Sequence, residues 1–408
     1  MANLLYLVHR MPYPPNKGDK VRSYHLLEHL RQRHRVFLGT FVDDPDDLQH
    51  VDKLRSMCAG LHAVTLNPRR ARLASLGGLL SGQALTLAYY RDDGLHRWVA
   101  DTVAQQHIDA AVVFSSSMAQ YAQRQPQLPM LVDLVDVDSA KWTDYASAHR
   151  WPMSWLYRRE GQRLLAYERA VVARSARSFL VTAKEVELFQ RLAPEAGTRV
   201  QALGNGVDAE FFAPDPHRAS PFDAGELPVV FTGAMDYWPN VDAVCWFAND
   251  VVPVLRSRWP ALRFHIVGRS PTPAVRALAS EAVSVTGTVA DVRPYLQHAA
   301  AVVAPLRLAR GVQNKVLEAM AMGRPVVCAG SCIEAIGTTP GHHILAADQA
   351  DSYSTQLNRL LAEPAWAQAV GSAGRRYVLD QFSWPARLAG LEEALASATA
   401  SNRKAGLS

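Results

Sequence analysis

The stretch that decides the fold reads PLRLARGVQNKVLEAMAMGRPVV and spans residues 305–327. An apolar strand ends at Pro305, and a polar loop containing Gly311 follows it. A short helix then runs to a glycine stop at Gly323, before another apolar strand. This order is typical of a parallel α/β unit, in which the loop after a strand borders the ligand crevice.

The polar residues of this stretch suit a phosphate-bearing ligand. The backbone amides of Val312, Gln313 and Asn314 stand where the helix begins, with Lys315 beside them. Glu318 follows one turn later on a similar face. We expect the amides and Lys315 to bind a diphosphate and Glu318 to bind a ribose diol. An ordinary amphipathic helix remains a compatible interpretation, because its apolar residues occupy the other side.

Apolar runs alternate with helix-like stretches along the chain, and turn formers interrupt them at LGNGVD, residues 203–208. Strands are predicted before this break at 4–9, 36–41, 110–114, 130–134 and 178–181, and after it at 229–232, 263–267, 284–286, 301–304 and 325–328. The 408 residues exceed what one hydrophobic core usually supports. We therefore expect an α/β protein with two doubly wound, Rossmann-like domains at 1–202 and 227–381, a linker at 203–226, and a C-terminal helix and tail at 382–408.

The composition excludes several classes of protein. Hydrophobic residues make up 49% and charged residues 20%, as in ordinary globular enzymes, and no apolar run is long enough to span a bilayer. The N-terminus has no basic start or cleavage site of a signal peptide. The net charge of +5 comes from scattered arginines and not from the basic blocks of a nucleic-acid surface. Phosphate-bearing small molecules or an anionic membrane surface fit better as partners.

The four cysteines are Cys58, Cys245, Cys328 and Cys332, and only the last two are close in sequence. This spacing does not make a disulfide framework. Buried, reduced thiols are the favoured interpretation, and metal binding is the alternative.

The loop after the first predicted strand, residues 9–22, borders the crevice of the first domain. Gly18 permits a close backbone approach, and Asp19 suits an N-cap. Arg22 in the first helical turn opposes the helix dipole, which favours a role in binding, although a plain surface arginine is an equal alternative. This helix start would bind an anion, with Arg22 adding positive charge.

A second acidic stretch ends the strand at 130–134. Asp133, Asp136 and Asp138 are predicted to alternate along one side of an extended chain, with Lys141 close behind. The carboxylates could act as a base, hold an acceptor hydroxyl or bind a metal. The alternative is that one of them caps the next helix. We expect at least one of these carboxylates to be functional.

Two segments combine basic and apolar residues. Residues 67–80 are basic and then apolar, and residues 151–163 carry tryptophans among arginines. Contact with an anionic membrane and ordinary packing as surface helices remain equal alternatives.

At these residues the chain resembles the retaining glycosyltransferase family 4, whose members have the GT-B fold of two Rossmann-like domains facing across a cleft. The matching stretches are 205–208, 231–233, 266–268, 285–295 and 317–327. The resemblance implies donor contacts at Gly233, at Asp291 and Val292 near the nucleotide base, and along Arg310, Gly311 and the following helix with Lys315 and Glu318.

Two departures from the family pattern concern the donor site. Arg310 stands where the family often has a glutamate that touches the donor sugar, and Gly233 is not followed by the usual arginine and lysine. Lys315 and Arg310 are the expected substitutes. The runs 12–22, 133–142 and 310–322 look closest to a bacterial subgroup associated with exopolysaccharide and the PEP-CTERM sorting system.

The resemblance thus implies a hexosyltransferase with Asp136, Lys315 and Glu318 as catalytic residues. We expect its acceptor to be bound by five residues of the first domain, namely Gly18, Asp19, Arg22, Asp133 and Lys141. It would move a sugar, with retention, from a nucleotide-sugar to a lipid-linked saccharide acceptor in exopolysaccharide or cell-surface glycan synthesis. We expect no metal and no cofactor, and a cytoplasmic location at the inner face of the membrane. The alternatives are a nucleotide-sugar epimerase of the same architecture and a catalytically inactive GT-B scaffold.

Overall fold

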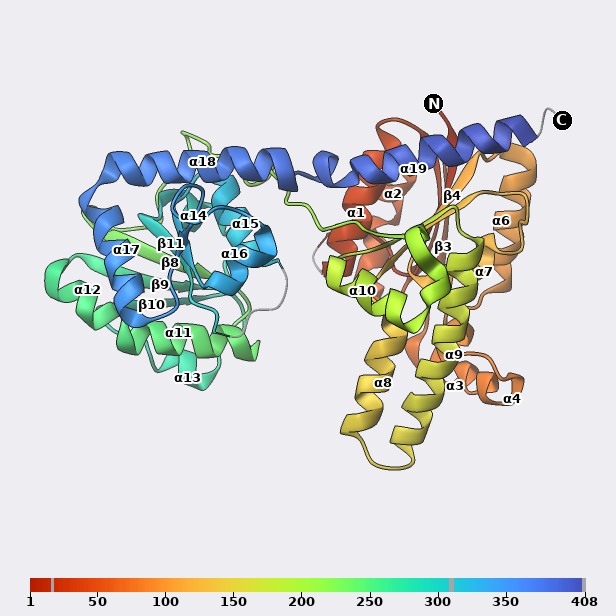
Figure 1. Cartoon of the computed structure of the whole chain (residues 1–408), viewed down its shortest axis with the longest axis horizontal. Coiled ribbons are helices and arrows are strands. Elements are labelled where there is room, and N and C mark those ends of the chain that lie inside the picture. The colour runs from red at the N-terminus through yellow and green to blue at the C-terminus, as the bar shows by residue number, and fades with distance from the viewer. Residues whose placement is uncertain (16–17, 308–311, 406–408) are drawn as a thin grey trace. The chain divides into compact units, whose positions relative to one another are not determined.

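The computed structural model describes residues 1–15, 18–307 and 312–405. These residues form two compact units (Figure 1). Unit 1 comprises Met1–Asn205 together with the chain from Arg387 onward, and unit 2 comprises Gly206–Ala386. The chain passes between the units after Asn205 and again before Arg387, within the stretches predicted as linker and as C-terminal helix.

Unit 1 contains a seven-stranded parallel sheet in the order β3-β2-β1-β4-β5-β6-β7. Its strands are β1 (Asn3–Val8), β2 (Arg35–Val42), β3 (Gly60–Thr65), β4 (Ala110–Phe114), β5 (Met130–Val135), β6 (Arg177–Leu180) and β7 (Val200–Ala202). The central strands β1 and β4 are almost wholly buried, which explains their continuous apolar sequences. The order reverses between them, so the loops that follow β1 and β4 border the ligand crevice of this sheet.

Helices surround this sheet, and one hairpin extends beyond it (Figure 1). The α-helices of unit 1 are α1 (Gly18–Arg31), α2 (Val51–Met57), α3 (Pro68–Ser75), α4 (Gly77–Ser81), α5 (Leu85–Tyr89), α6 (Asp93–Gln106), α7 (Ala119–Ala122), α8 (Asp138–Ala148), α9 (Met153–Arg174) and α10 (Ala183–Leu192). Short 3-10 helices lie at Pro45–His50, Ser116–Met118 and Pro194–Arg199. The extended hairpin is formed by α8 and α9, which pack along each other.

The last helix, α19 (Trp384–Ala405), packs on unit 1 from Arg387 onward. Its residues Leu388, Leu391 and Leu395 are buried, at the helical spacing expected from the sequence. His29 and His34 both contact the Glu392 carboxylate, and hydrogen bonding, first from His29, lowers the pKa of Glu392. These contacts decide which unit the final segment covers, a question that the sequence left open.

Unit 2 contains a six-stranded parallel sheet in the order β10-β9-β8-β11-β12-β13. Its strands are β8 (Leu227–Thr232), β9 (Leu262–Val267), β10 (Val283–Gly287), β11 (Ala301–Ala304), β12 (Val326–Cys328) and β13 (Leu345–Ala346). The helices are α11 (Trp238–Asp250), α12 (Val252–Arg258), α13 (Pro273–Arg276), α14 (Arg293–His298), α15 (Asn314–Ala321), α16 (Gly330–Ile336), α17 (Ala350–Ala362) and α18 (Pro364–Phe382). Here the order reverses between β8 and β11.

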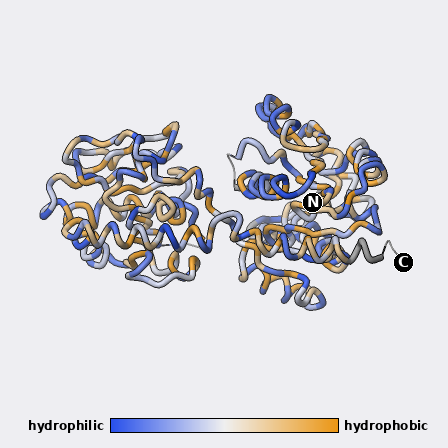
Figure 2. Tube along the Cα trace, turned by 90° about the horizontal axis from the view of Figure 1, so that it is seen from above, coloured by the Kyte–Doolittle hydropathy of each residue, from blue (hydrophilic) through white to orange (hydrophobic). Residues whose placement is uncertain are grey.

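Hydrophobic and hydrophilic segments alternate along the chain in both units (Figure 2). The structure confirms the predicted α/β class and each predicted strand to within a few residues. The strands β3, β7 and β13 were missed. Residues of β3 are only half-buried, whereas β7 and β13 have three and two residues, so none carries a long apolar run.

Across the described ranges, no helix combines the length and the apolar character needed to cross a membrane. The four cysteines are free thiols. Cys328 and Cys332 are buried as expected, whereas Cys58 and Cys245 are only half-buried. Within the same ranges, histidine, cysteine and carboxylate side chains do not gather in threes as metal ligands would.

Candidate functional site

The ligand crevice of unit 2 lies where β8 and β11 are neighbours and the strand order reverses. Gly233 follows β8 directly, and the loop after β11 leads to α15. The helix begins at Asn314, and its N-cap residue Gln313 makes no side-chain capping bond to the helix. Val312 lies just before them, whereas Arg310 and Gly311 fall outside the described residues.

Lys315 is fixed above the end of β8. Its Nζ donates to Asn240 Oδ1 at 2.6 Å and lies 4.1 Å from the centre of the Phe231 ring. Asn240 Nδ2 in turn donates to the Ala234 carbonyl at 2.9 Å, so the amide bridges the lysine and the loop after β8. The ammonium group is thereby held at the switch point of the sheet.

Gly233 leaves the space that this lysine needs. A Cβ at this position would lie 2.9 Å from Lys315 Nζ and 2.8 Å from Asn240 Nδ2. A Cβ at Gly268, after β9, would lie 1.7 Å from the Gly233 carbonyl oxygen. The two glycine turns therefore pack directly against each other, and their bare backbones face the crevice.

Burial shifts the pKa values of Lys315 and Glu318 in opposite directions. Desolvation lowers the pKa of Lys315 to about 7, although the nearby Glu318 acts to raise it. Desolvation raises the pKa of Glu318 to about 7, although Lys315 acts to lower it. No hydrogen bond to the Glu318 carboxylate is found among the described residues. An anion near Lys315 would restore the charge of the lysine, as at many functional sites with shifted pKa values.

Asp291 and Val292 follow β10 at the same edge of the sheet. The Asp291 carboxylate accepts from the Arg293 backbone amide at 2.9 Å and pairs with the Arg293 guanidinium at 2.8 Å. Arg293 also lies 4.0 Å above the Phe211 ring. The side chain of Asp291 is therefore engaged within this loop, and the backbone groups of the loop are left for the expected contact with the nucleotide base.

In unit 1, Arg22 and Asp133 form a buried ion pair. Each side chain is 1% exposed, and Arg22 Nε donates to Asp133 Oδ2 at 2.7 Å. The same guanidinium donates to Asn205 Oδ1 and to the Leu203 carbonyl, both at 2.8 Å. Neither a surface arginine nor an exposed acidic group is found here. We therefore propose that the pair ties the end of unit 1 to its sheet, in place of the expected acceptor contacts.

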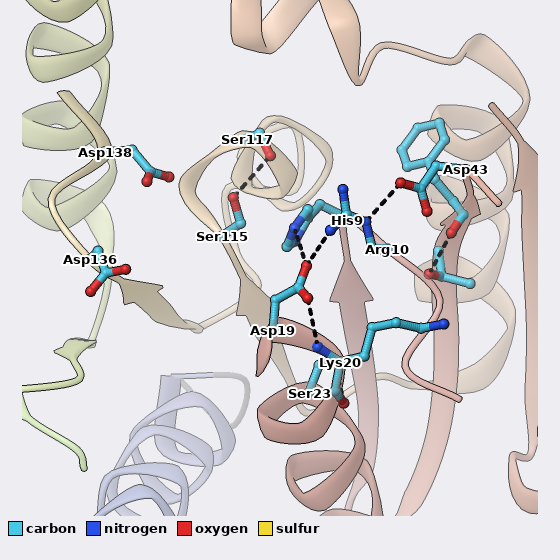
Figure 3. A network of polar contacts seen from close by, with 12 residues as sticks. His9, Arg10, Asp19, Lys20, Ser23, Asp43, Ser115, Ser117, Asp136 and Asp138 are labelled. Atoms are coloured by element: carbon cyan, nitrogen blue, oxygen red, sulfur yellow. Dashed lines mark hydrogen bonds and ion pairs between the residues drawn. The ribbon is translucent and has the colours of Figure 1, made fainter. Parts of the chain in front are cut away.

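Asp19 lies in the first turn of α1, which begins at Gly18, and not at the expected N-cap. Its carboxylate contacts Arg10 Nη1 at 2.6 Å and lies 3.7 Å from His9 Nε2, and Arg10 also pairs with Asp43 (Figure 3). The contact with His9, followed by the ion pair with Arg10, holds the pKa of Asp19 well below its usual range. Asp19 is thus an ionised partner of the residues that end β1.

The acidic stretch after β5 does not continue as a strand. Val135 adopts a φ of 69°, so the chain turns before Asp136, and Asp138 begins α8. The prediction that Asp133 shares one side of a strand with the other two carboxylates was therefore wrong. Lys141 Nζ contacts Asp136 at 2.8 Å and Asp138 at 3.0 Å, and the three side chains are partly exposed. Burial alone would lower the pKa of Lys141, but the two carboxylates raise it above its usual value.

Sequence reasoning missed Asn240, which positions Lys315. The available signal was weak, because an asparagine after Pro239 in a first helical turn suits many helix starts. Sequence reasoning also passed over His9 and Ser115, which follow the paired strand ends Val8 and Phe114.

Comparisons with known proteins agree with this geometry. Residues 226–363 match the family described as Glycosyl transferases group 1. A GDP-mannose-dependent alpha-(1-6)-phosphatidylinositol monomannoside mannosyltransferase from Mycolicibacterium smegmatis is 30% identical over 217 residues, which are 48% of this chain and 56% of that protein. The match thus spans little more than half the length of this curated relative.

The fold as a whole resembles solved structures. Sucrose-phosphate synthase from Thermosynechococcus elongatus superposes with a TM-score of 0.65 at 16% identity, covering 98% of this chain and 100% of that chain. Anabaena Alr3699/HepE in complex with UDP superposes with a TM-score of 0.62 at 15% identity, covering 97% and 100%. At such identities the likeness concerns the fold alone. Residues 226–363 of unit 2 are thus similar to the group 1 glycosyltransferases, and the chain as a whole has the GT-B fold.

Proposed function

We propose that this protein transfers a hexose from a nucleotide-sugar donor bound by unit 2 to a saccharide acceptor bound by unit 1. One observation carries the proposal. Lys315 is held by Asn240 above Gly233, at the switch point of the domain that matches the group 1 family. A lysine, a helix N-terminus and a bare glycine turn are the groups that bind a diphosphate.

In the proposed reaction the bond between the sugar C1 and the diphosphate oxygen breaks, and the diphosphate leaves with the bonding electrons. A bond from C1 to the acceptor hydroxyl oxygen forms, and the hydroxyl proton passes to the Asp136 carboxylate. Lys315 and the α15 amides around Val312, Gln313 and Asn314 stabilise the charge that develops on the leaving diphosphate. Glu318 accepts from the ribose hydroxyls. Asp136, which Lys141 holds at 2.8 Å, orients the acceptor hydroxyl. Retention at C1 is part of the proposal, and NMR of the product linkage tests it.

The mannosyltransferase of Mycolicibacterium smegmatis supports a lipid-linked acceptor and GDP-mannose, whereas the HepE complex supports UDP. We therefore leave both nucleotides in the proposal. Synthesis of an exopolysaccharide or cell-surface glycan, in a system of the PEP-CTERM type, is the proposed setting.

The hairpin of α8 and α9 supports contact with an anionic membrane. At its tip Trp151 is 79% exposed and Trp155 is 54% exposed, with the exposed basic residues Arg150 and Arg158 beside them. Interfacial tryptophans with nearby arginines suit an anionic lipid surface. We expect flotation with anionic but not zwitterionic liposomes, and weaker flotation of a Trp151→Ser/Trp155→Ser double variant. Equal flotation of both forms would contradict this surface.

Incubation with UDP- and GDP-hexoses tests the function itself, with and without a lipid-linked saccharide fraction. The proposal predicts a longer saccharide and free nucleoside diphosphate only when donor and acceptor are both present. An altered nucleotide-sugar formed from donor alone would favour the epimerase. No product and no nucleotide binding would favour the inactive scaffold.

A further inference from the structure

Unit 1 has a pocket of about 480 Å³ at its own switch point. His9 follows β1 and Ser115 follows β4, and these strands pair in register through Val8 and Phe114. The pocket therefore opens at the carboxyl ends of the two strands between which the sheet order reverses. This is the position at which an open α/β sheet binds its ligand.

Aromatic side chains form much of the pocket wall. Tyr89 and Tyr90 come from the end of α5, Trp142 and Tyr145 from α8, and Tyr157 from α9. The Trp142 ring centre lies 5.4 Å from that of Tyr157 and 5.9 Å from that of Tyr145. These rings present flat apolar faces together with hydroxyl groups.

Buried carboxylates fix this wall in place. Glu160 of α9 is 2% exposed and accepts from the backbone amides of Leu85 and Thr86 at 2.6 and 2.9 Å, which anchors α5. Glu168 of α9 is 1% exposed and accepts from the Ser139 hydroxyl at 2.6 Å, which anchors α8. The helices that carry the aromatic rings are thus held by hydrogen bonds to buried glutamates.

Polar side chains that already contact neighbouring groups complete the lining. The His9 ring stacks on Phe114, with its Nε2 near the Asp19 carboxylate (Figure 3). Ser115 Oγ lies 3.1 Å from Ser117 Oγ. At the rim, Lys141 is already paired with two carboxylates, and Arg72 is exposed. The lining lacks the glycine turn and the desolvated lysine that serve a diphosphate in unit 2.

We propose that this pocket binds an uncharged sugar ring of the acceptor, and that His9 and Asp138 hold its hydroxyls. This inference rests on the proposed glycosyl transfer and adds the acceptor's chemistry. A pyranose has apolar C–H faces, which pack on aromatic rings, and hydroxyls at its edge, which bond to histidine, serine and carboxylate groups. The α8–α9 hairpin forms part of the pocket, and its residues Tyr145 and Leu156 lie close to the tip. An acceptor anchored in a membrane at the tip would therefore approach along these helices.

Saturation-transfer NMR on the full chain tests the pocket, with methyl glucopyranoside, methyl mannopyranoside and maltose as probes. We expect a signal from at least one probe, a loss of at least about tenfold in affinity for Trp142→Ala, and partial recovery for Trp142→Phe. Trp366→Ala is the matched control, because this partly buried tryptophan belongs to unit 2 and does not line the pocket. UDP and GDP binding should be unchanged by Trp142→Ala.

Three outcomes would contradict the proposal that this pocket binds a sugar. They are no signal from any probe, equal signals for the wild type and Trp142→Ala, and stronger binding of glucose 1-phosphate that depends on Arg72. The pocket and the proposed function fail separately. Trp142-dependent glycoside binding without any nucleotide binding would support the sugar site and contradict the transferase function. Sugar transfer with an unchanged acceptor KM in Trp142→Ala would support the transferase function and contradict the sugar site.

Discussion

Unit 1 and unit 2 are built on sheets whose first six strands follow the same order, β3-β2-β1-β4-β5-β6 in one and β10-β9-β8-β11-β12-β13 in the other. The two switch points differ in chemistry. That of unit 2 has Gly233 and the desolvated Lys315, whereas that of unit 1 has His9 and Ser115 beneath aromatic rings. One topology therefore offers two different ligand sites, and the residues after the strands decide which ligand each suits.

The buried pair of unit 1 is expected to show the largest effect. Arg22→Ala leaves the Asp133 carboxylate buried without its cation, which costs about 3–5 kcal/mol of unfolding free energy. Urea unfolding followed by hydrogen exchange of β5 peptides measures this loss in unit 1 alone. The double variant Arg22→Met/Asp133→Leu should recover most of it. A loss below about 1 kcal/mol, as for exposed pairs, would contradict the structural role.

Asp136→Asn separates the tasks of the two units. We expect sugar transfer to fall at least about 100-fold, because the amide no longer accepts the hydroxyl proton, while UDP and GDP binding stays intact. Asp144→Asn is the matched control, since this exposed aspartate lies on α8 away from the pocket lining. Normal turnover by Asp136→Asn would contradict the catalytic role of Asp136.

Gly233→Ala tests the ligand site of unit 2 alone. Its Cβ would press on Lys315 Nζ and Asn240 Nδ2, so we expect nucleotide affinity to fall about tenfold, which corresponds to about 1.4 kcal/mol. Calorimetric titration measures the loss. Gly77→Ala is the control, because nothing lies within 4 Å of its Cβ. Equal affinities of the two variants would show that the close approach at Gly233 is not used.

Proton linkage is the smallest expected effect, at most about one proton per nucleotide bound. A bound diphosphate raises the pKa of Lys315 from about 7, so binding at pH 8.5 takes up a proton. A ribose held by Glu318 lowers the pKa of that carboxyl from about 7, so binding at pH 5.5 releases one. Calorimetry in buffers of different ionisation enthalpy measures both the proton uptake and the proton release. Lys315→Met should abolish the uptake and Glu318→Gln the release, and the same sign at both pH values would contradict the pair's role.

The sequence was sufficient for the architecture, because buried parallel strands such as β4 and β11 are continuous apolar runs. It was also sufficient to single out the segment around Lys315, since a helix start after a strand is a local pattern. Partners distant in the sequence could not be predicted in this way. Asn240 lies 75 residues from Lys315, and Asp133 lies 111 residues from Arg22.

The unit 1 pocket was hidden for a similar reason. Its aromatic lining comes from α5, α8 and α9, and in each helix these residues read as ordinary amphipathic positions. The turn at Val135 likewise could not be read from its residue type, because a β-branched residue disfavours a positive φ. Tertiary packing decides both features.

The central claim is that unit 2 binds the nucleotide through Lys315. A thermal-shift screen of wild type, Lys315→Ala and Arg307→Ala against UDP, GDP, ADP and their sugar conjugates tests it most directly. Arg307 is the matched cation, because it belongs to the loop after β11 but is paired with Asp242. The account predicts stabilisation by one nucleotide family that is lost in Lys315→Ala and kept in Arg307→Ala. A flat response of the wild type, or equal stabilisation of all three proteins, would contradict it.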